Sequence, residues 1–512
     1  MKKIVTLFVA VVTFLDPAYC FEVWINSQEL SHFDYIQVTL KGWKGDSSEL
    51  RLVLLKDGGT SVDLLGRDTV TPRLVGEDLV FLYIPNYGVR DGIYEILILS
   101  NDVEIFRTNV VFVSRQQLKL CEPLKILTFE ENVSILKLVT NRGRVSYKEV
   151  ANLISSLMKK IGLNTFVILG GQTTFLKNPR EVWYSGVLSN LKVLKHLKEE
   201  GIQTGAYVMC FLTLGQTKKN SFKGYLPNLV FRGKKIEEDY KYTSILSHRR
   251  VEDIVEILTY LGRRNDIDFL GLDFIRVGDY GGYEMFFDFY EEIYSKLSTN
   301  SVPFIARPKG RRKEVEEFAK LVSRREDVRK IFRWYQAVRV SRVIKAIRDK
   351  LRERGITKPI VAFMLGWNAG REHGQDLFMF RDAGVDYAFY MLYEFYNDRM
   401  FEEAGNYYLR YVYNLDTNIV FGNIIDSVLN RGSKGPLKTF SERLKKFVTY
   451  YSYFPPNGFF FHDIYRLYFG RLGSFKTEDW IKEIEEAVMF IDETTFSENR
   501  SFPEKTTLGS SE

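Results

Sequence analysis

From about residue 120 onward, the sequence alternates short apolar runs with long amphipathic stretches, and this rhythm constrains the fold more than any other feature. Short runs rich in β-branched and aromatic residues predict strands, and amphipathic stretches predict helices. The runs with strand character are 124–129, 165–169, 204–211, 269–275, 359–366, 385–393, 418–425 and 458–465. Their eightfold alternation with helices predicts an α/β fold, a (β/α)8 TIM barrel over residues 118–492. A doubly wound open sheet is the alternative.

Residues 21–117 follow a different pattern, in which short apolar runs alternate with turns that contain Gly and Asp. The strand-like runs are 35–40, 50–55, 79–84, 94–99 and 109–113. Several strands at near-regular spacing, without a helical period between them, predict a small all-β domain, an immunoglobulin-like sandwich. No catalytic constellation is visible in it. We therefore expect a structural module, with glycan binding as the alternative.

Residues 1–20 have the pattern of a secretory signal peptide. Lys2 and Lys3 precede an apolar run over 4–15 that is too short to span a bilayer, and a cleavage point follows Cys20. Lipidation of Cys20 and an uncleaved anchor are the alternatives. We expect an exported protein, periplasmic or extracellular, with no transmembrane segment in the mature chain. The polar residues 493–512 predict a flexible tail.

The net charge of +7 is mild, but it is concentrated in one segment. Residues 303–354 do not fit the eightfold rhythm, and from 307 to 354 they hold 18 Lys or Arg against 7 Asp or Glu. We expect a basic helical insertion into the barrel. Such a charge run is typical of a solvated helical face, and the functional alternative is an anionic partner such as an acidic glycan. For an exported protein we expect no nucleic acid partner.

Two carboxylates follow predicted strands at the end of the barrel where catalysis takes place in this fold. Asp273 follows Leu-Gly-Leu in the fourth run, and Arg276 could hold it ionised, as a nucleophile or base requires. Glu394 follows the sixth run, where apolar neighbours would raise its pKa, as a general acid requires. Two carboxylates that face each other across a barrel mouth can hydrolyse a glycosidic bond. A structural ion pair is the alternative for each.

Aromatic and polar residues near the other strand ends are candidates for substrate binding. Trp367 follows the fifth run and offers a flat ring on which a sugar could stack, and Trp334 of the basic segment could reach over the site. The candidates that could position the substrate or bind its hydroxyl groups are Arg276, His373, Gln375, Tyr393, Asn423, His462 and Asp463. A hydrogen-bonded core histidine is the alternative for His462.

The sequence carries no recognisable pattern for a metal or a cofactor. It has five His but no His-x-His or His-Glu-x-x-His pair, so we expect no metal site. Gly-x-Ser-x-Gly, a Walker loop and a dinucleotide fingerprint are also absent, and we expect no cofactor. Three Cys in 512 residues exclude a disulfide scaffold.

Several of these motifs resemble a known group of proteins. Leu-Gly-Leu-Asp-Phe-Ile-Arg at 270–276 is similar to the fourth-strand motif of many glycoside hydrolase barrels. The segments 366–394 and 461–466 resemble bacterial glycosyl-hydrolase-like (β/α)8 barrel proteins of unassigned substrate. The resemblance covers roughly 120–475 and extends distantly to glycoside hydrolases of the α-galactosidase and α-amylase types.

The resemblance implies that Asp273 is the catalytic nucleophile or base. Glu394 occupies the position of the acid, although the α-galactosidase-like and α-glucosidase-like clans have Asp there, and strand five ends in Trp367 without the carboxylate of the α-amylase pattern. The sequence therefore predicts an exported glycoside hydrolase that cleaves a poly- or oligosaccharide. A non-catalytic barrel that binds glycan or assembles a surface polymer is the alternative. An amidase or deacetylase would need a metal cluster that the sequence does not display.

Overall fold

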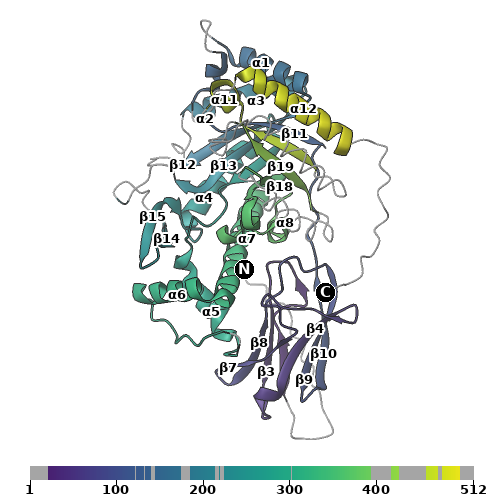
Figure 1. Cartoon of the computed structure of the whole chain (residues 1–512), viewed down its shortest axis with the longest axis vertical. Coiled ribbons are helices and arrows are strands. Elements are labelled where there is room, and N and C mark those ends of the chain that lie inside the picture. The colour runs from purple at the N-terminus through teal and green to yellow at the C-terminus, as the bar shows by residue number, and fades with distance from the viewer. Residues whose placement is uncertain are drawn as a thin grey trace.

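The computed structural model describes residues 21–121, 123–131, 133–139, 145–173, 185–213, 218, 224–300, 302–393, 417–425, 457–470 and 476–495. Within them, an N-terminal β-sandwich lies beneath a barrel that is surrounded by helices (Figure 1). The expected signal peptide at 1–20 lies outside the described residues. So does the expected tail, except for its first three residues, which belong to the last helix.

The N-terminal domain consists of two packed sheets. One sheet contains, in order, β1 (Glu22–Ile25), β3 (Ile36–Lys41), β8 (Asp78–Tyr83) and β7 (Arg73–Val75). The other contains β2 (Glu29–Leu30), β10 (Val103–Phe112), β9 (Gly92–Ser100), β4 (Leu50–Lys56) and β5 (Gly59–Thr60), with β6 (Thr69–Val70) paired to β4. Buried and partly exposed residues alternate along β3, as expected for a strand with one face in a core. The predicted β-sandwich is confirmed.

The larger domain is a closed parallel sheet. Its strands are β11 (Leu124–Phe129), β12 (Thr165–Thr173), β13 (Gln203–Thr213), β16 (Phe269–Asp273), β17 (Ile360–Leu365), β18 (Tyr387–Met391), β19 (Ile419–Ile424) and β20 (Gly458–His462). The pairing of β12 with β13 closes the circle. The predicted (β/α)8 TIM barrel is therefore confirmed, and the open sheet is excluded. An antiparallel hairpin of β14 (Pro227–Phe231) and β15 (Ile236–Thr243) extends the sheet from β13.

Aromatic rings fill the interior of the barrel. Phe363, Phe389 and Phe460 contact one another, with ring centroids 5.2 to 5.6 Å apart. Phe460 reaches the axis because it lies against Gly422 of β19, where a Cβ atom would overlap the ring. The interior is thus a packed core, and ligands have access only at the ends of the strands.

Helices cover the outside of the barrel (Figure 1). They are α1 (Tyr147–Ile161), α2 (Ser185–Asn190), α3 (Lys192–Glu199), α4 (His248–Gly262), α5 (Phe286–Glu292), α6 (Arg312–Arg324), α7 (Glu326–Glu353), α8 (Leu377–Ala383), α11 (Ile464–Phe469) and α12 (Thr477–Thr495). Short 3-10 helices are η1 (Ser47–Glu49), η2 (Ile135–Val139), η4 (Tyr283–Met285), η5 (Tyr294–Lys296) and η6 (Trp367–His373). In the described part of the chain, none of the helices is both long and apolar enough to cross a bilayer.

Helix α1 shows how the local sequence defines an element. Ser146 and Glu149 form a reciprocal capping box at its start, and Gly162 ends it with a left-handed φ of 84°. Val150, Ile154 and Met158 lie on the face that packs into the core. Their spacing is that of one side of a helix, so this amphipathic stretch buries a single face.

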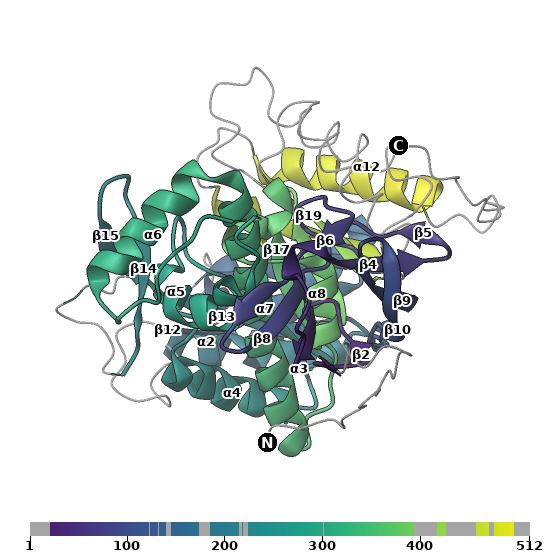
Figure 2. The same ribbon diagram turned by 90° about the horizontal axis from the view of Figure 1, so that it is seen from below.

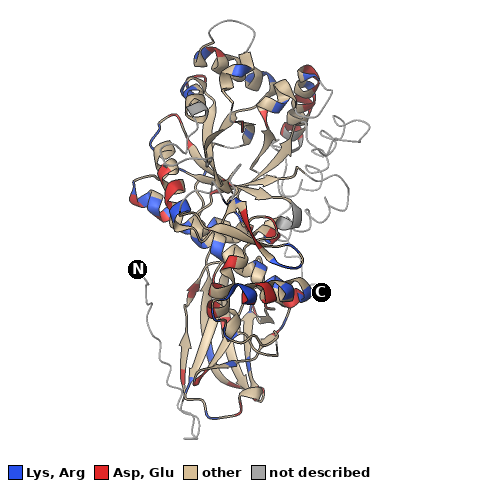
Figure 3. Ribbon diagram, turned by 90° about the vertical axis from the view of Figure 1, so that its left-hand side faces the viewer, with Lys and Arg blue, Asp and Glu red and all other residues tan. Residues whose placement is uncertain are grey.

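The basic segment 303–354 forms α6 and α7. Helix α7 connects β16 to β17 and packs on α4 and α8, so part of the expected insertion is a helix of the barrel itself. Acidic side chains of neighbouring elements pair with basic side chains of the segment. Arg342 Nη2 lies 2.6 Å from Glu292, and Arg354 Nη1, just after α7, lies 2.7 Å from Glu256. Acidic and basic residues are accordingly interspersed along these helices (Figure 3). Much of the local positive charge is neutralised within the fold.

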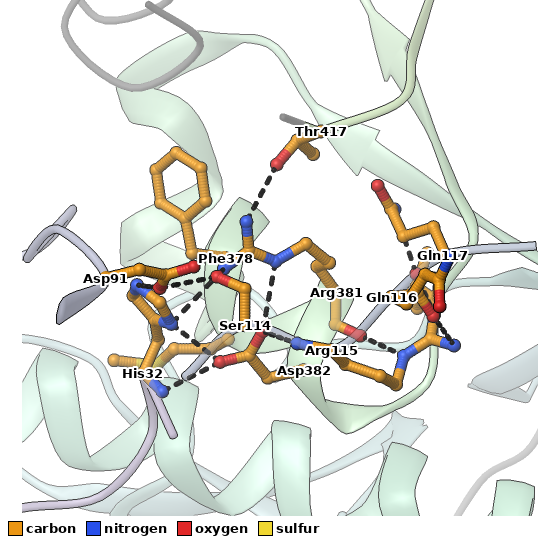
Figure 4. Close-up of polar contacts among 12 residues, drawn as sticks. His32, Asp91, Ser114, Arg115, Gln116, Gln117, Phe378, Arg381, Asp382 and Thr417 are labelled. Atoms are coloured by element: carbon orange, nitrogen blue, oxygen red, sulfur yellow. Dashed lines mark hydrogen bonds and ion pairs between the residues drawn. The ribbon is translucent and has the colours of Figure 1, made fainter. Parts of the chain in front are cut away.

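A buried polar network joins the sandwich to the barrel (Figure 4). The backbone N–H of His32 donates to Asp382 Oδ2 at 2.9 Å, and His32 Nδ1 lies 2.6 Å from the same oxygen. On the other side, Arg381 Nε donates to Asp382 Oδ1 at 3.0 Å. Arg115, in the segment that connects the domains, donates to the buried Asp386 at 2.8 Å. Seen from below, the sandwich lies across α7 and α8, against which Tyr35 and His32 pack (Figure 2).

We expect Asp382→Asn to reduce the free energy of unfolding by about 3 kcal/mol at neutral pH, because the change leaves buried cationic and polar partners uncompensated. Burial alone would raise the pKa of Asp382, but its interactions with His32 and Arg381 lower it below the usual range. The contribution of Asp382 is therefore present above the ordinary pKa of Asp and is lost as the pH falls through the lowered value. Denaturant unfolding at several pH values measures this difference.

The matched control is Glu95→Gln, because the Glu95–Arg107 pair is exposed on the sandwich, with 45% and 48% of the two side chains accessible. We expect it to cost less than about 1 kcal/mol. Equal and small losses in the two variants would show that the domain interface does not depend on Asp382.

Candidate active site

Four strands of the barrel carry polar residues to the same mouth. Glu130 follows β11, Asp273 ends β16, Tyr393 lies beyond β18, and His462 ends β20. Because the strands are parallel, their C-terminal ends open on one face of the barrel. Glu130 was not among the candidates from the sequence. The rule that identified Asp273 would have found it, since Glu130 directly follows the predicted strand 124–129.

Asp273 is buried, with 7% of its surface exposed. The N–H of Phe274, a residue with a φ of 49°, donates to Asp273 Oδ1 at 2.7 Å. Burial and the Glu130 carboxylate raise the pKa of Asp273 to about 7, against the opposing charge of Arg276. We expected Arg276 to hold Asp273 ionised. The pKa is raised instead, because the loss of solvation of the buried carboxylate outweighs the favourable charge of Arg276.

Glu130 and His462 form an ion pair at the mouth. His462 Nε2 lies 2.5 Å from Glu130 Oε2, and its Nδ1 lies 2.9 Å from the hydroxyl of Thr128. Burial opposes a charge on His462, but Glu130 overcomes this effect and raises its pKa. The Tyr393 ring stacks on the imidazole, with centroids 5.5 Å apart and an interplanar angle of 16°. A positive charge on His462 and a negative charge on Glu130 thus favour each other.

Asp463 positions this pair. Its Oδ1 accepts a hydrogen bond from the N–H of Arg466 at 2.9 Å and so caps α11, and its Oδ2 accepts one from the N–H of Glu130 at 3.3 Å. Ligand atoms of Glu130, His462 and Asp463 lie within 4.8 Å of one another, which is close enough for a metal ion. In the described residues, Glu130 and His462 already form an ion pair, and Asp463 accepts two backbone hydrogen bonds. Their geometry is explained by an ion pair held by a helix cap.

Arg276 lies near Asp273, and its charge also acts on His373 at the end of η6. The Arg276 guanidinium lies over the Phe274 ring, 4.4 Å from its centroid. His373 Nδ1 lies 3.3 Å from the carbonyl oxygen of Val277 and 3.8 Å from the Asp279 carboxylate. Burial and then the charge of Arg276 lower the pKa of His373 to about 4. The His373 ring is thus neutral at ordinary pH and can exchange hydrogen bonds without carrying charge.

Two further candidates use their polar groups on the protein's own backbone. Gln375 is fully buried: its Oε1 accepts from Leu365 N–H at 2.9 Å and its Nε2 donates to the Phe363 carbonyl at 3.2 Å. It holds the end of β17 in place. Asn423, near the end of β19, is buried and accepts a hydrogen bond from the N–H of Ile424 at 2.9 Å.

The remaining candidates lie away from this cluster or outside the described residues. Trp334 is buried in α7 and packs edge-on against Tyr35 of the sandwich, with ring centroids 6.4 Å apart. Trp367 begins η6, but its side chain is outside the described part of the structure. Glu394, the expected general acid, also lies outside the described residues.

Neither a protein-family model nor a curated protein matches the chain. Solved structures that resemble it include an exo-β-1,4-mannosidase from Opitutaceae bacterium strain TAV5, at 12% identity and a TM-score of 0.39. That match covers 72% of this chain and 59% of the mannosidase, so this chain spans less than two thirds of its length. A GH36 α-galactosidase from Geobacillus stearothermophilus matches at 11% identity and a TM-score of 0.39, covering 93% of this chain and 68% of that one.

A pullulanase from Paenibacillus barengoltzii matches at 10% identity and a TM-score of 0.38, covering 88% of this chain and 79% of that one. These neighbours are glycoside hydrolases by name. At these identities and scores the similarity does not extend to activity.

We expect Glu130→Gln to lower the pKa of Asp273 by about one unit, because the variant removes the neighbouring negative charge that raises it. Titration of the carboxyl carbons by NMR measures this change. The control is Glu131→Gln, which removes the next carboxylate along the chain. An unchanged Asp273 titration in Glu130→Gln would mean that the two carboxylates are not coupled.

Proposed function

We propose that the barrel is a glycoside hydrolase that cleaves a poly- or oligosaccharide with a pair of carboxylates at its mouth. The observation that carries this proposal is the pairing of Asp273, whose pKa is raised to about 7, with Glu130, which is ion-paired to His462. Glycoside hydrolysis needs one protonated carboxyl group, which donates a proton to the glycosidic oxygen. It also needs one ionised carboxylate, which acts as base or nucleophile.

The roles follow from the electrostatics. The protonated carboxyl of Asp273 donates its proton to the glycosidic oxygen as the bond from that oxygen to the anomeric carbon breaks. The ionised Glu130 either attacks the anomeric carbon or removes a proton from the attacking water. These assignments differ from the sequence expectation, in which Asp273 was the nucleophile or base. Glu394 is a third carboxylate to be tested beside them.

Aromatic rings around the two carboxylates suit a sugar substrate. Phe274 and Tyr393 are partly exposed, and Tyr242 lies near Phe274, with ring centroids 6.4 Å apart. All three rings offer an apolar face that matches the C–H faces of a sugar, and the two tyrosines add a hydroxyl group that can hydrogen-bond to it. Arg276 and His373 would hydrogen-bond its hydroxyl groups, and Trp367 would add a stacking surface. Export to the periplasm or beyond belongs to the same proposal, on the pattern of residues 1–20.

One observation favours a non-catalytic alternative, a barrel that binds glycan or assembles a surface polymer. Asp273 is only 7% exposed, and the Arg276 guanidinium is buried nearby against Phe274. An acid that cannot reach a glycosidic oxygen would leave a binding surface without turnover. The two functions are separated by direct measurement of bond cleavage.

We expect Asp273→Asn and Glu130→Gln each to reduce reducing-sugar release by at least about a hundredfold, because each removes one of the two groups that act on the bond. The assay uses the purified 21–512 protein on plant, bacterial and acidic polysaccharides, with Glu394→Gln as a further variant and Glu131→Gln as the control. Full activity in Asp273→Asn would overturn the assignment. No release by the wild type, with the polymers still retarding it in an affinity gel, would establish the binding barrel.

The pH profile tests the protonation state of Asp273. We expect kcat to fall as the pH rises through about 7, because the acid form is then lost. In Arg276→Met this alkaline limb should move upward by about one unit, since the charge that lowers the pKa is gone. A downward shift would assign the limb to another group.

A further inference from the structure

A cavity lies between the two domains, and none of Glu130, Asp273, Tyr393 and His462 lines it. It has a volume of about 410 Å³. The sandwich contributes Leu64 and Tyr87 to its wall, and the first turns of α7 contribute Arg329 and Arg333. Arg371 of η6 completes it, with its guanidinium over the Tyr87 ring at 4.2 Å from the centroid.

Two buried donors in this cleft have no acceptor among the described residues. The hydroxyl of Tyr87 and Nε of Arg333 are both shielded from solvent and without a hydrogen-bond partner. The rest of the Arg333 guanidinium is held in place, since its Nη1 donates to Gln336 Oε1 at 2.9 Å and to the Glu372 carbonyl at 2.5 Å. A buried donor without an acceptor is costly, and proteins rarely leave one unless a ligand or water satisfies it.

The wall of the cleft carries a net positive charge, which would attract the same anionic ligand that these donors could bind. Four cations line it, against the two carboxylates of Glu326 and Glu372. Glu326 is engaged by Lys330 at 3.4 Å. Arg329 is exposed and forms no ion pair within the described part of the chain, and its charge acts unfavourably on Arg333. Most other basic residues of α7 pair with acidic side chains, among them Arg339, Arg342 and Lys350. The cleft wall keeps a positive excess.

We propose that this interdomain cleft binds a small ligand carrying a carboxylate or phosphate group. Its oxygens would accept hydrogen bonds from the Tyr87 hydroxyl and from Arg333, and Arg329 would balance its charge. Arginine presents a planar fork of donors that matches both oxyanions. The cavity is larger than a bare ion needs, and its Leu64 and Tyr87 walls would contact the body of the ligand. The inference does not depend on hydrolysis at the barrel mouth.

Calorimetric titration of the 21–512 protein at low ionic strength tests this, with galacturonate, inorganic phosphate and galactose as probes. Galactose differs from galacturonate in lacking the carboxylate. We expect Tyr87→Phe, which keeps the ring under Arg371, to weaken anion binding about tenfold, and Arg329→Ala to weaken it about fivefold. The control is Arg324→Ala, which removes an equal charge from α6 outside the cleft. Higher salt should weaken binding, because the attraction is electrostatic.

The outcomes are distinct. Binding of galacturonate but not galactose, lost in the two cleft variants and kept in Arg324→Ala, supports the site and assigns it an acidic saccharide. The same pattern with phosphate alone also supports the site and assigns it a phosphorylated ligand. The proposal is overturned if neither anion binds, if galactose binds as well as galacturonate, or if Arg324→Ala weakens binding as much as Arg329→Ala does.

Discussion

Closure of the parallel sheet through the pairing of β12 with β13 is the constraint on which the rest of the structure depends. Once the circle is closed, all strands point the same way and their C-terminal ends surround one mouth. Residues 130 and 463 are thereby brought into hydrogen-bond contact although 333 positions separate them. The packed aromatic interior, with Phe460 seated against Gly422, excludes ligands from the barrel axis and leaves the mouth as the place for chemistry.

The ionisable groups of the mouth lie between the packed interior of the barrel and solvent, and this position shifts their pKa values. Asp273 stands at the end of a fully buried strand, so its charged form loses solvation and its pKa rises to about 7. Glu130 is partly exposed and is engaged by a histidine whose pKa its charge raises. Burial and pairing thus give two coupled carboxyl groups different environments at one mouth, and the charge of Glu130 helps to raise the pKa of Asp273.

The domain interface depends on a related balance of charges. Asp382 and Asp386 are buried between arginines that come from the barrel and from the connecting segment, and they fix the sandwich against α7 and α8. The same docking brings Tyr87 close to the first turns of α7, where Arg329 and Arg333 form no ion pair with any residue that the structure describes. Although many basic residues of the segment 303–354 pair with neighbouring acidic side chains, this cleft keeps a positive excess.

The sequence by itself determined the eight strands of the barrel and the position of Asp273 at the end of one of them, because burial imposes a pattern that can be read along the chain. It also placed His462 and Asp463 at the last strand. It did not predict Glu130 as the partner of His462, the raised pKa of Asp273, or the backbone contacts of Gln375. Those depend on distances between segments far apart in the chain and on how much water reaches each group. Only the tertiary structure decides such distances and burial. The pattern of apolar residues along the sequence shows which face of a helix or strand is buried, but not which residues pack against that face.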